Sequence, residues 1–162
     1  MSDHWEQRRA GVGCPLCAPR PDVNESVLLV RKLPVSSLYL ARNQTYRGQC
    51  MLVYDVRHVN RLDELELAEW QALARDIWLA GRAVTLEFDP QHMNVESLGN
   101  EVPHLHWHLI PRYRDDGRWG GPIWTTQSSE LRSLRLPEAQ YLDRVRALAG
   151  RIDALESGIA SA

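Results

Sequence analysis

The sequence predicts an α+β domain with a mainly antiparallel five-stranded sheet, one central helix and a C-terminal helix. Two observations lead to this fold class. Five short β-prone runs fall into a group of three and a group of two, separated by one long segment with helical periodicity. A second helical stripe follows the last run. At 162 residues the chain has the length of a single domain, which is enough to bury a substantial core.

The first third of the chain contains an arm and three strands. Residues 1–26 include several glycines and prolines and predict an irregular arm. The three β-prone runs cover residues 27–30, 37–41 and 50–56. Turn-forming residues, Gly48 among them, separate the second run from the third. This order predicts three strands joined by short connections.

The central helix is predicted from a capping box at residues 63–66, followed by apolar residues at helical spacing. These apolar residues are Trp70, Leu73, Ile77, Ala80 and Val84. Asp89 and Pro90 end the helix. Two further strands are expected, at residues 92–98 and 103–111.

The C-terminal part combines a long loop with a helix. Residues 113–135 are rich in Gly, Arg, Ser and Trp with little periodicity, and they predict a loop. Pro137 suits the first residue of a helix, and apolar residues at helical spacing extend that helix to residue 157.

Charge and cysteine content limit the possible partners. A net charge of −2 leaves no basic excess for binding bulk nucleic acid. No apolar run approaches the roughly 20 residues that span a bilayer, and the N-terminus lacks the apolar core of a signal peptide. Three cysteines, an odd number, suit a reducing compartment better than a disulfide framework. We therefore expect a cytoplasmic protein without membrane partners.

The most informative segment is the predicted last strand, which carries histidines at positions 104, 106 and 108. Alternation along a strand predicts that these three imidazoles share one face, while Leu105, Trp107 and Leu109 share the other. Burial explains the apolar face. Three adjacent imidazoles instead point to a metal, an anion or a catalytic step. His106 lies between the other two, so it is the natural nucleophile of the group.

The pattern His-apolar-His-apolar-His-apolar-apolar resembles the signature of the histidine triad (HIT) family, whose members cleave nucleotidyl phosphoanhydride or phosphoramidate bonds. Residues 40–53 resemble the family's strand-turn-strand, although Gln49 stands where the family usually has His. Arg57-His58 resembles the family's helix entry. The loop at residues 112–124 is similar to that of bacterial members resembling dinucleoside polyphosphate (diadenosine tetraphosphate) hydrolases.

This resemblance implies a domain organisation and an assembly. It suggests a core domain over residues 27–125, with the arm at 1–26 as part of it and a C-terminal loop and helix at 126–162 packing on it. Family members usually form homodimers, so a homodimer is expected. The resemblance also implies that the chemical step needs no cofactor.

The resemblance assigns roles to individual residues as well. His106 forms a nucleotidyl-histidine intermediate that water then hydrolyses, His108 binds the phosphate and helps to protonate the leaving group, and His104 completes the triad. The expected substrate-binding residues are Asn43 beside the ribose, and Asn94, Gly99 and Asn100 near the phosphate. Each asparagine could equally be a turn residue.

A second candidate site begins in the arm, where Cys14-Pro-Leu-Cys17 has the spacing of a zinc knuckle. Zinc-binding relatives in the superfamily take two further ligands from a histidine at the helix entry and from the first triad histidine. Those positions match His58 and His104, so a structural zinc bound by Cys14, Cys17, His58 and His104 is expected. The alternative is a pair of free thiols.

Two other functions remain open at this point. His104 and His106 could bind a catalytic zinc in a metal-dependent hydrolase, or the chain could be a nucleotide-binding sensor with little turnover.

Two details of the loop are also open. Arg112 and Arg114 could steer a polyphosphate or simply be solvated, and the tryptophans of the loop could stack on a base or hold the loop on the core.

Overall fold

The computed structural model describes residues 2–17, 19–125 and 134–160. A five-stranded sheet has the order β1-β2-β3-β5-β4, and every neighbouring pair is antiparallel. The strands are β1 (Val27–Lys32), β2 (Ser36–Ala41), β3 (Cys50–Tyr54), β4 (His92–Glu96) and β5 (His106–Arg112). The helices are α1 (Ser2–Arg9), α2 (Leu67–Phe88) and α3 (Glu138–Ala160), with short 3-10 turns η1 (Leu62–Glu64) and η2 (Ile123–Thr125). The predicted α+β fold is confirmed.

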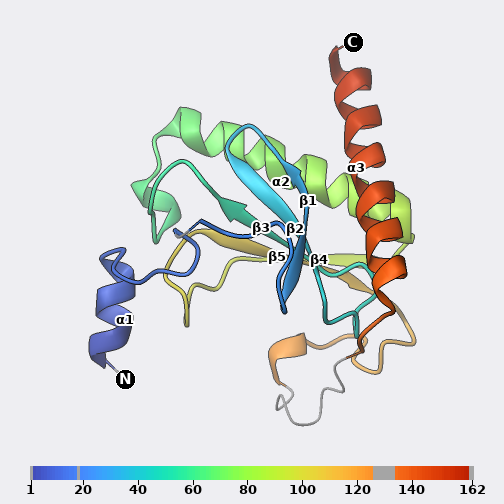
Figure 1. Cartoon of the computed structure of the whole chain (residues 1–162), viewed down its shortest axis with the longest axis horizontal. Helices are drawn as coiled ribbons and strands as arrows, with labels where there is room; N and C mark the ends of the chain where they lie inside the picture. Colours follow the sequence, from blue (N-terminus) through green and yellow to red (C-terminus); the bar gives the residue numbers. More distant parts are fainter. Residues whose placement is uncertain (1, 18, 126–133, 161–162) are drawn as a thin grey trace.

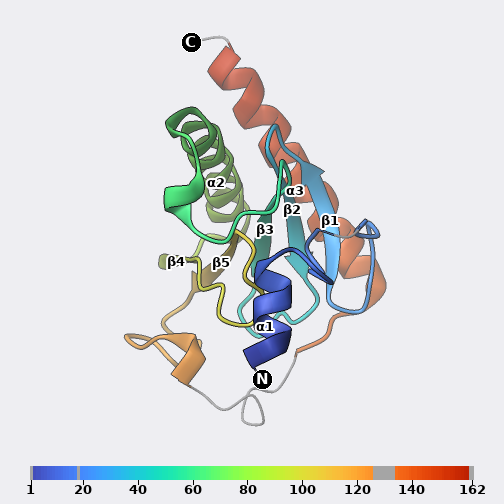
Figure 2. The same cartoon turned by 90° about the vertical axis from the view of Figure 1, so that its left-hand side faces the viewer.

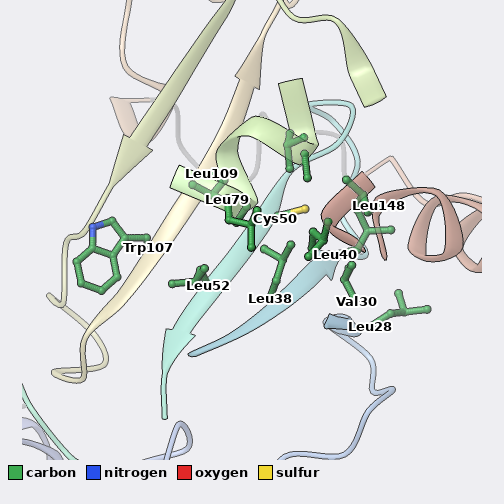
Figure 3. Close-up of a cluster of buried hydrophobic side chains, with 14 of the residues drawn as sticks. Leu28, Val30, Leu38, Leu40, Cys50, Leu52, Leu79, Trp107, Leu109 and Leu148 are labelled. Atoms are coloured by element: carbon green, nitrogen blue, oxygen red, sulfur yellow. The ribbon is translucent and has the colours of Figure 1, made fainter. Parts of the chain in front are cut away.

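One face of the sheet forms the hydrophobic core together with α2 and α3. Leu38, Leu52 and Trp107 are aligned across β2, β3 and β5, because paired residues in an antiparallel sheet point to the same side. Figure 3 shows these residues with Leu79 of α2 and Leu148 of α3. Both helices therefore cover the same face of the sheet (Figure 1).

The opposite face of the sheet carries the polar residues of interest. Tyr39, Met51, His108 and Glu96 form one row across β2, β3, β5 and β4. Figures 1 and 2 place the N-terminus and the C-terminus at opposite ends of the molecule, with α1 beyond the end of the sheet. None of the described helices is long and apolar enough to cross a membrane.

The N-terminal arm is not entirely irregular, because α1 occupies most of its first ten residues. This helix has no apolar periodicity that would predict it, since Trp5 is its only large apolar residue. The carbonyl group of its last residue, Arg9, contacts residues far along the chain. The carbonyl oxygen of Arg9 lies 3.0 Å from His58 Nε2 and accepts a hydrogen bond from Asn60 Nδ2 at 3.2 Å. Tertiary contacts, not periodicity, thus stabilise the end of α1.

The capping box, the start of the last strand and the loop after it also differ from the prediction. The capping box lies one turn later than expected: Glu66 is the N-cap of α2, and the Glu69 side chain accepts a hydrogen bond from its backbone N–H at 2.9 Å. The last strand starts at His106 instead of residue 103, so His104 precedes it. Within the loop predicted at 113–135, residues 123–125 form η2, whereas 126–133 lie outside the described residues.

Gly48 confirms the predicted turn between β2 and β3 and shows why glycine is needed there. Its φ of +86° is strained for other residues, and a Cβ would lie 2.4 Å from the ring of Phe88 at the end of α2. The turn therefore packs its backbone directly against the helix.

Candidate active site and metal cluster

His106 and His108 are neighbours on the face of β5 opposite the helices α2 and α3, and they line a cavity of about 440 Å³. Their ring centroids are 5.1 Å apart, with an interplanar angle of 78°. Gly99 and Asn100, from the connection between β4 and β5, line the same cavity. The structure thus brings together two of the predicted catalytic histidines and two of the predicted substrate-binding residues.

The ring of His106 has a defined tautomer. Its Nδ1 lies 2.7 Å from the backbone carbonyl oxygen of His104. A carbonyl oxygen can only accept a hydrogen bond, so Nδ1 carries a proton, and in the neutral ring Nε2 is the nitrogen with the lone pair. The side chain is only 8% exposed, so its orientation is fixed by packing as well. Such a ring is prepared to attack an electrophile through Nε2.

His108 is kept neutral by its surroundings. Burial and the neighbouring His106 lower the pKa of His108 to about 4, while Glu96 on the adjacent strand opposes this shift. On its other side, His108 contacts the ring of Trp124 edge to face, with centroids 5.0 Å apart. The ring therefore lies between a histidine, a tryptophan and a carboxylate, and a phosphate bound beside it would raise its proton affinity.

Glu96 is a residue of this site that the sequence interpretation missed. It pairs directly with His108 across the strands, accepts a hydrogen bond from Asn94 Nδ2 at 3.0 Å, and is hydrogen-bonded to the indole N–H of Trp124. The signal was present, since Glu96 and Asn94 are two residues apart on one strand and must share a face. Glu96 therefore holds Trp124 against His108.

Two other predicted residues lie further away. Asn94 lies two residues before Glu96 in β4 and lines a separate cavity on the same face. Asn43 is in the turn between β2 and β3, where its Oδ1 accepts hydrogen bonds from the backbone N–H of Thr45 at 3.1 Å and from its hydroxyl at 2.7 Å. Asn43 is not among the residues that line the cavity of His106 and His108.

Cys14, Cys17, His58 and His104 converge on one point beside the triad. One ligand atom from each residue lies within 4.8 Å of all the others. The Sγ of Cys17 is 3.0 Å from His58 Nδ1 and 3.3 Å from His104 Nδ1, and the Sγ of Cys14 is 3.6 Å from His104 Nδ1. Ligand atoms of a tetrahedral zinc ion lie about 3.3–3.8 Å apart, so the four residues offer the right donor atoms, and small shifts of the side chains would bring them to the separations of such an ion.

The second nitrogen of each histidine supports this fit. Nε2 of His104 lies 2.8 Å from the carbonyl oxygen of Tyr54, and Nε2 of His58 lies 3.0 Å from that of Arg9. Both Nε2 atoms must therefore be protonated, which leaves both Nδ1 lone pairs facing the cysteines. Metal-binding histidines are typically oriented by such a carbonyl partner.

This arrangement argues against the metal-dependent hydrolase in which His104 and His106 bind a shared zinc ion. Each ring nitrogen of His104 faces either the cysteines or Tyr54, and Nδ1 of His106 faces a carbonyl. Neither ring nitrogen of His104 remains for an ion shared with His106. Burial also lowers the pKa of His104, which favours the neutral, ligating form of the ring.

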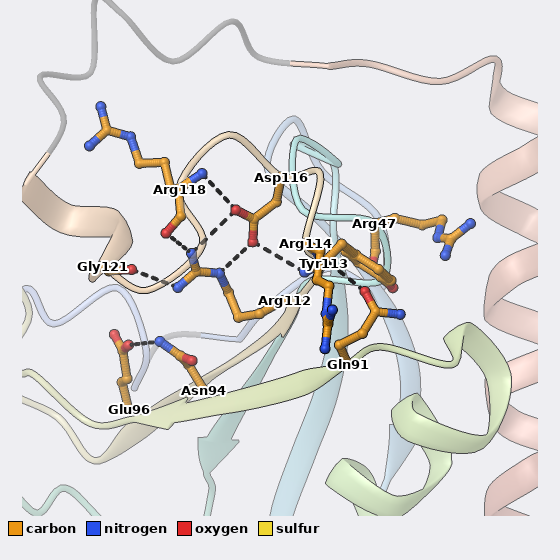
Figure 4. Close-up of polar contacts among 10 residues, drawn as sticks. All are labelled: Arg47, Gln91, Asn94, Glu96, Arg112, Tyr113, Arg114, Asp116, Arg118 and Gly121. Carbon is orange, nitrogen blue, oxygen red and sulfur yellow. Dashed lines mark hydrogen bonds and ion pairs between the residues drawn. The ribbon is translucent and has the colours of Figure 1, made fainter.

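Arg112, at the end of β5, has neither of the two roles considered for it. Its side chain is 5% exposed and forms an ion pair with Asp116, which is 1% exposed, with an Nε–Oδ2 distance of 2.7 Å. The guanidinium also donates to the carbonyl oxygens of Arg118 and Gly121 (Figure 4). Arg112 therefore closes the loop at residues 112–121 and is not free to bind a polyphosphate.

Comparison with known proteins establishes the family. The model of the HIT domain matches residues 25–115, which is more than half of the chain. The chain therefore belongs to the HIT family. Proteins of this family are in general nucleotide hydrolases and transferases. No curated protein sequence matches the chain.

Solved structures agree with the fold. A histidine triad protein from Bradyrhizobium japonicum is similar with a TM-score of 0.73 and 23% identity, over 85% of this chain and 99% of the other. One from Marinobacter aquaeolei VT8 has a TM-score of 0.70 and 26% identity, over 80% and 91% of the two chains. A Zn-bound histidine triad family protein from Mycobacterium smegmatis has a TM-score of 0.55 and 16% identity, over 80% and 86%.

Proposed function

We propose that this protein is a nucleotide hydrolase or nucleotidyl transferase that cleaves a phosphoanhydride or phosphoramidate bond at a nucleotidyl phosphorus. The observation that carries the proposal is the tautomer of His106. With Nδ1 protonated toward the His104 carbonyl, Nε2 is a neutral nucleophile in a cavity large enough for a small ligand.

The proposed reaction has two steps. His106 Nε2 attacks the nucleotidyl phosphorus, the bond to the leaving group breaks, and a nucleotidyl-histidine forms. His108 binds the phosphate and assists protonation of the leaving group. Water then attacks the phosphorus and releases the nucleotide and His106. As positive charge develops on the His106 ring, the hydrogen bond from its Nδ1 to the carbonyl of His104 becomes stronger.

Asn100 and Gly99 are proposed to position the phosphate, because they line the cavity next to the two histidines. The backbone of Gly99 has a φ of +66°, and a Cβ there would find only the carbonyl oxygen of Val102, at 4.0 Å. Glycine is thus needed for its backbone conformation and not to avoid a neighbour. Asn43 remains a proposed ribose contact.

We further propose that Cys14, Cys17, His58 and His104 hold a structural zinc ion. When bound, the ion would supply a fixed link between the arm and the start of β5. His104 then has two functions, since its ring faces the cysteines while its carbonyl oxygen accepts the Nδ1–H of His106. The cluster would therefore hold the backbone group that orients the nucleophile.

The proposed substrates are dinucleoside polyphosphates, as the resemblance of the loop at residues 112–124 suggests. The proposed setting is the cytoplasm, and the proposed assembly is a homodimer. The edge strand β4 supports the last point, because its Val95 is 47% exposed and its outer hydrogen-bonding groups face no other described strand.

Turnover of diadenosine tetraphosphate and of adenosine 5′-phosphoramidate, followed by product chromatography, tests the proposal. The wild type should release AMP, and His106→Asn should lose several orders of magnitude in rate. His4→Asn is the matched control, because His4 is an exposed histidine of α1 that lines neither this cavity nor the neighbouring one that contains Asn94. Full activity of the His106→Asn variant would contradict the covalent mechanism.

A further inference from the structure

The carboxylate of Glu96 faces the ring of His108 across the last two strands of the sheet. Glu96 in β4 and His108 in β5 are direct partners in the antiparallel register, so their side chains lie on the same face. Directly opposite residues of such a pair have Cβ atoms about 4.5–5.5 Å apart. The carboxylate therefore lies close enough for a substantial electrostatic interaction with the imidazole.

Two hydrogen bonds fix the orientation of the Glu96 side chain. Its Oε1 accepts a hydrogen bond from Asn94 Nδ2 at 3.0 Å, and its Oε2 accepts one from the indole N–H of Trp124. Both donors are neutral, and within the described part of the chain Glu96 forms no ion pair with a lysine or arginine. The negative charge of Glu96 is therefore not neutralised by a neighbouring cation, and it acts on His108.

The other surroundings of His108 do not favour a proton on its ring. Besides Glu96, the described titratable groups that face the ring or line its cavity are His106 of the same strand and Glu101 of the connection before β5. Its partner on β3, Met51, carries no charge. Burial and His106 lower the pKa of His108 to about 4, and Glu96 opposes this shift. The ring is therefore neutral at pH 7 in the free protein.

A neutral His108 has to gain a proton from solvent before it can donate one to a leaving group. A phosphate bound beside the ring favours this step, because it adds a negative charge. When the bond to phosphorus breaks, its electron pair goes to the leaving oxygen or nitrogen, which takes the proton, and His108 becomes neutral again. A second negative charge, fixed next to the ring, allows the same cycle at a higher pH.

We propose that Glu96 is a positioning residue for this proton transfer, and that its carboxylate stabilises the protonated ring of His108 while the substrate is bound. The proposal rests on the proposed function, because only there does His108 act on a leaving group. The charge of Glu96, and not its size, is the property that matters for this role.

The first test follows the protonation of His108 itself. Its ring is titrated by NMR without ligand and with saturating AMP, in the wild type, Glu96→Gln and Glu96→Asp. Glu96→Gln keeps the size of the side chain and an oxygen for the indole of Trp124, but it removes the charge. The midpoint for His108 should be about 0.5–1.5 pH units lower than in the wild type, and Glu96→Asp should recover most of this shift. Glu87→Gln, which removes a carboxylate paired with Arg151 between α2 and α3, should leave the midpoint unchanged.

The second test compares two substrates whose leaving groups differ in their need for a proton. An alkylamine leaves its phosphoramidate with AMP as a protonated group, whereas p-nitrophenol leaves its ester with AMP as the anion. The rate of the first turnover is measured by rapid mixing, at a pH above the wild-type midpoint of His108. Glu96→Gln should slow cleavage of the phosphoramidate by about 3- to 30-fold, which is the expected pH shift at tenfold per unit. Cleavage of the p-nitrophenyl ester should change by less than about 2-fold.

Two results would overturn the proposal. One is a titration midpoint of His108 that Glu96→Gln leaves unchanged. The other is an equal loss of rate with both substrates, because it would indicate that Glu96 only supports the local structure. Failure of the wild type to cleave either substrate would contradict the proposed function instead, and the NMR titration would still decide whether Glu96 acts on His108.

Discussion

Replacing Arg112 with methionine should destabilise the protein by about 3–4 kcal/mol. Within the described part of the chain, the substitution leaves the Asp116 carboxylate, 1% exposed, with hydrogen bonds only from the backbone N–H groups of Tyr113 and Arg118. Removing one partner of a buried ion pair typically costs about 3–5 kcal/mol, and the two remaining donors favour the lower part of that range. The midpoint of thermal unfolding should fall by about 6–15 °C.

Urea unfolding at one fixed protein concentration measures this change. The control is Arg146→Met, because Arg146 forms an ion pair with Asp143 on the surface of α3, with both side chains about 70% exposed. That pair should contribute no more than about 0.5 kcal/mol. If Arg112→Met costs less than about 1 kcal/mol, or no more than Arg146→Met, the buried pair does not hold the loop as described.

The pH dependence of Asp116→Asn gives a second check on the same pair. Burial alone would raise the pKa of Asp116, but hydrogen bonds from Arg112 and from two backbone N–H groups outweigh it and lower the pKa. A carboxyl with a lowered pKa in the folded state stabilises the protein above its unfolded pKa of about 3.9. The difference between wild type and Asp116→Asn should therefore be full at pH 7 and shrink as the pH falls below about 4.

Three further predictions concern the metal cluster, His108 and the assembly. Protein purified without chelator should contain one zinc per chain by elemental analysis; Cys17→Ser should lose it, whereas Cys50→Ala, in the buried core, should retain it. The free energy of unfolding should decrease as the pH falls from about 6.5 to 4, because His108 becomes protonated in the unfolded chain while the fold keeps it neutral. Unfolding measured across this pH range should show a shallower decrease in His108→Gln. Light scattering at micromolar concentration should give twice the mass of one chain. Retention of zinc by Cys17→Ser would contradict the proposed metal site. A pH dependence of stability in His108→Gln as steep as in the wild type would contradict the role given to His108, and the mass of a single chain would contradict the homodimer.

The architecture could be predicted because short β-prone runs are separated by one long segment with helical periodicity, and because the last strand alternates between histidines and apolar residues. In β5 that alternation places Trp107 and Leu109 in the core and His106 and His108 on the opposite face. Helix α1 could not be predicted, because its end is fixed by His58, which lies about fifty residues further along the chain. Contacts of this kind leave no periodic signal in the helix itself.

The site was only partly accessible from the sequence. The resemblance to the HIT family, rather than residue spacing, suggested that His58 and His104 join Cys14 and Cys17, and the structure brings these four residues together. The role of Arg112 depends on a loop that folds back so that carbonyl groups reach its guanidinium. No local pattern distinguishes such an arginine from a solvated one, because its partners are set by the tertiary fold.

Intact mass spectrometry after brief mixing with adenosine 5′-phosphoramidate or diadenosine tetraphosphate tests the central claim most directly. The wild type should show a transient adduct of one adenylate, and acid quenching at successive times should show it decay as AMP appears. His106→Asn should form no adduct, whereas His4→Asn, which changes an exposed histidine of α1, should behave as the wild type. AMP release without any adduct in the wild type, or an adduct that persists in His106→Asn, would contradict the assignment of His106 as the nucleophile.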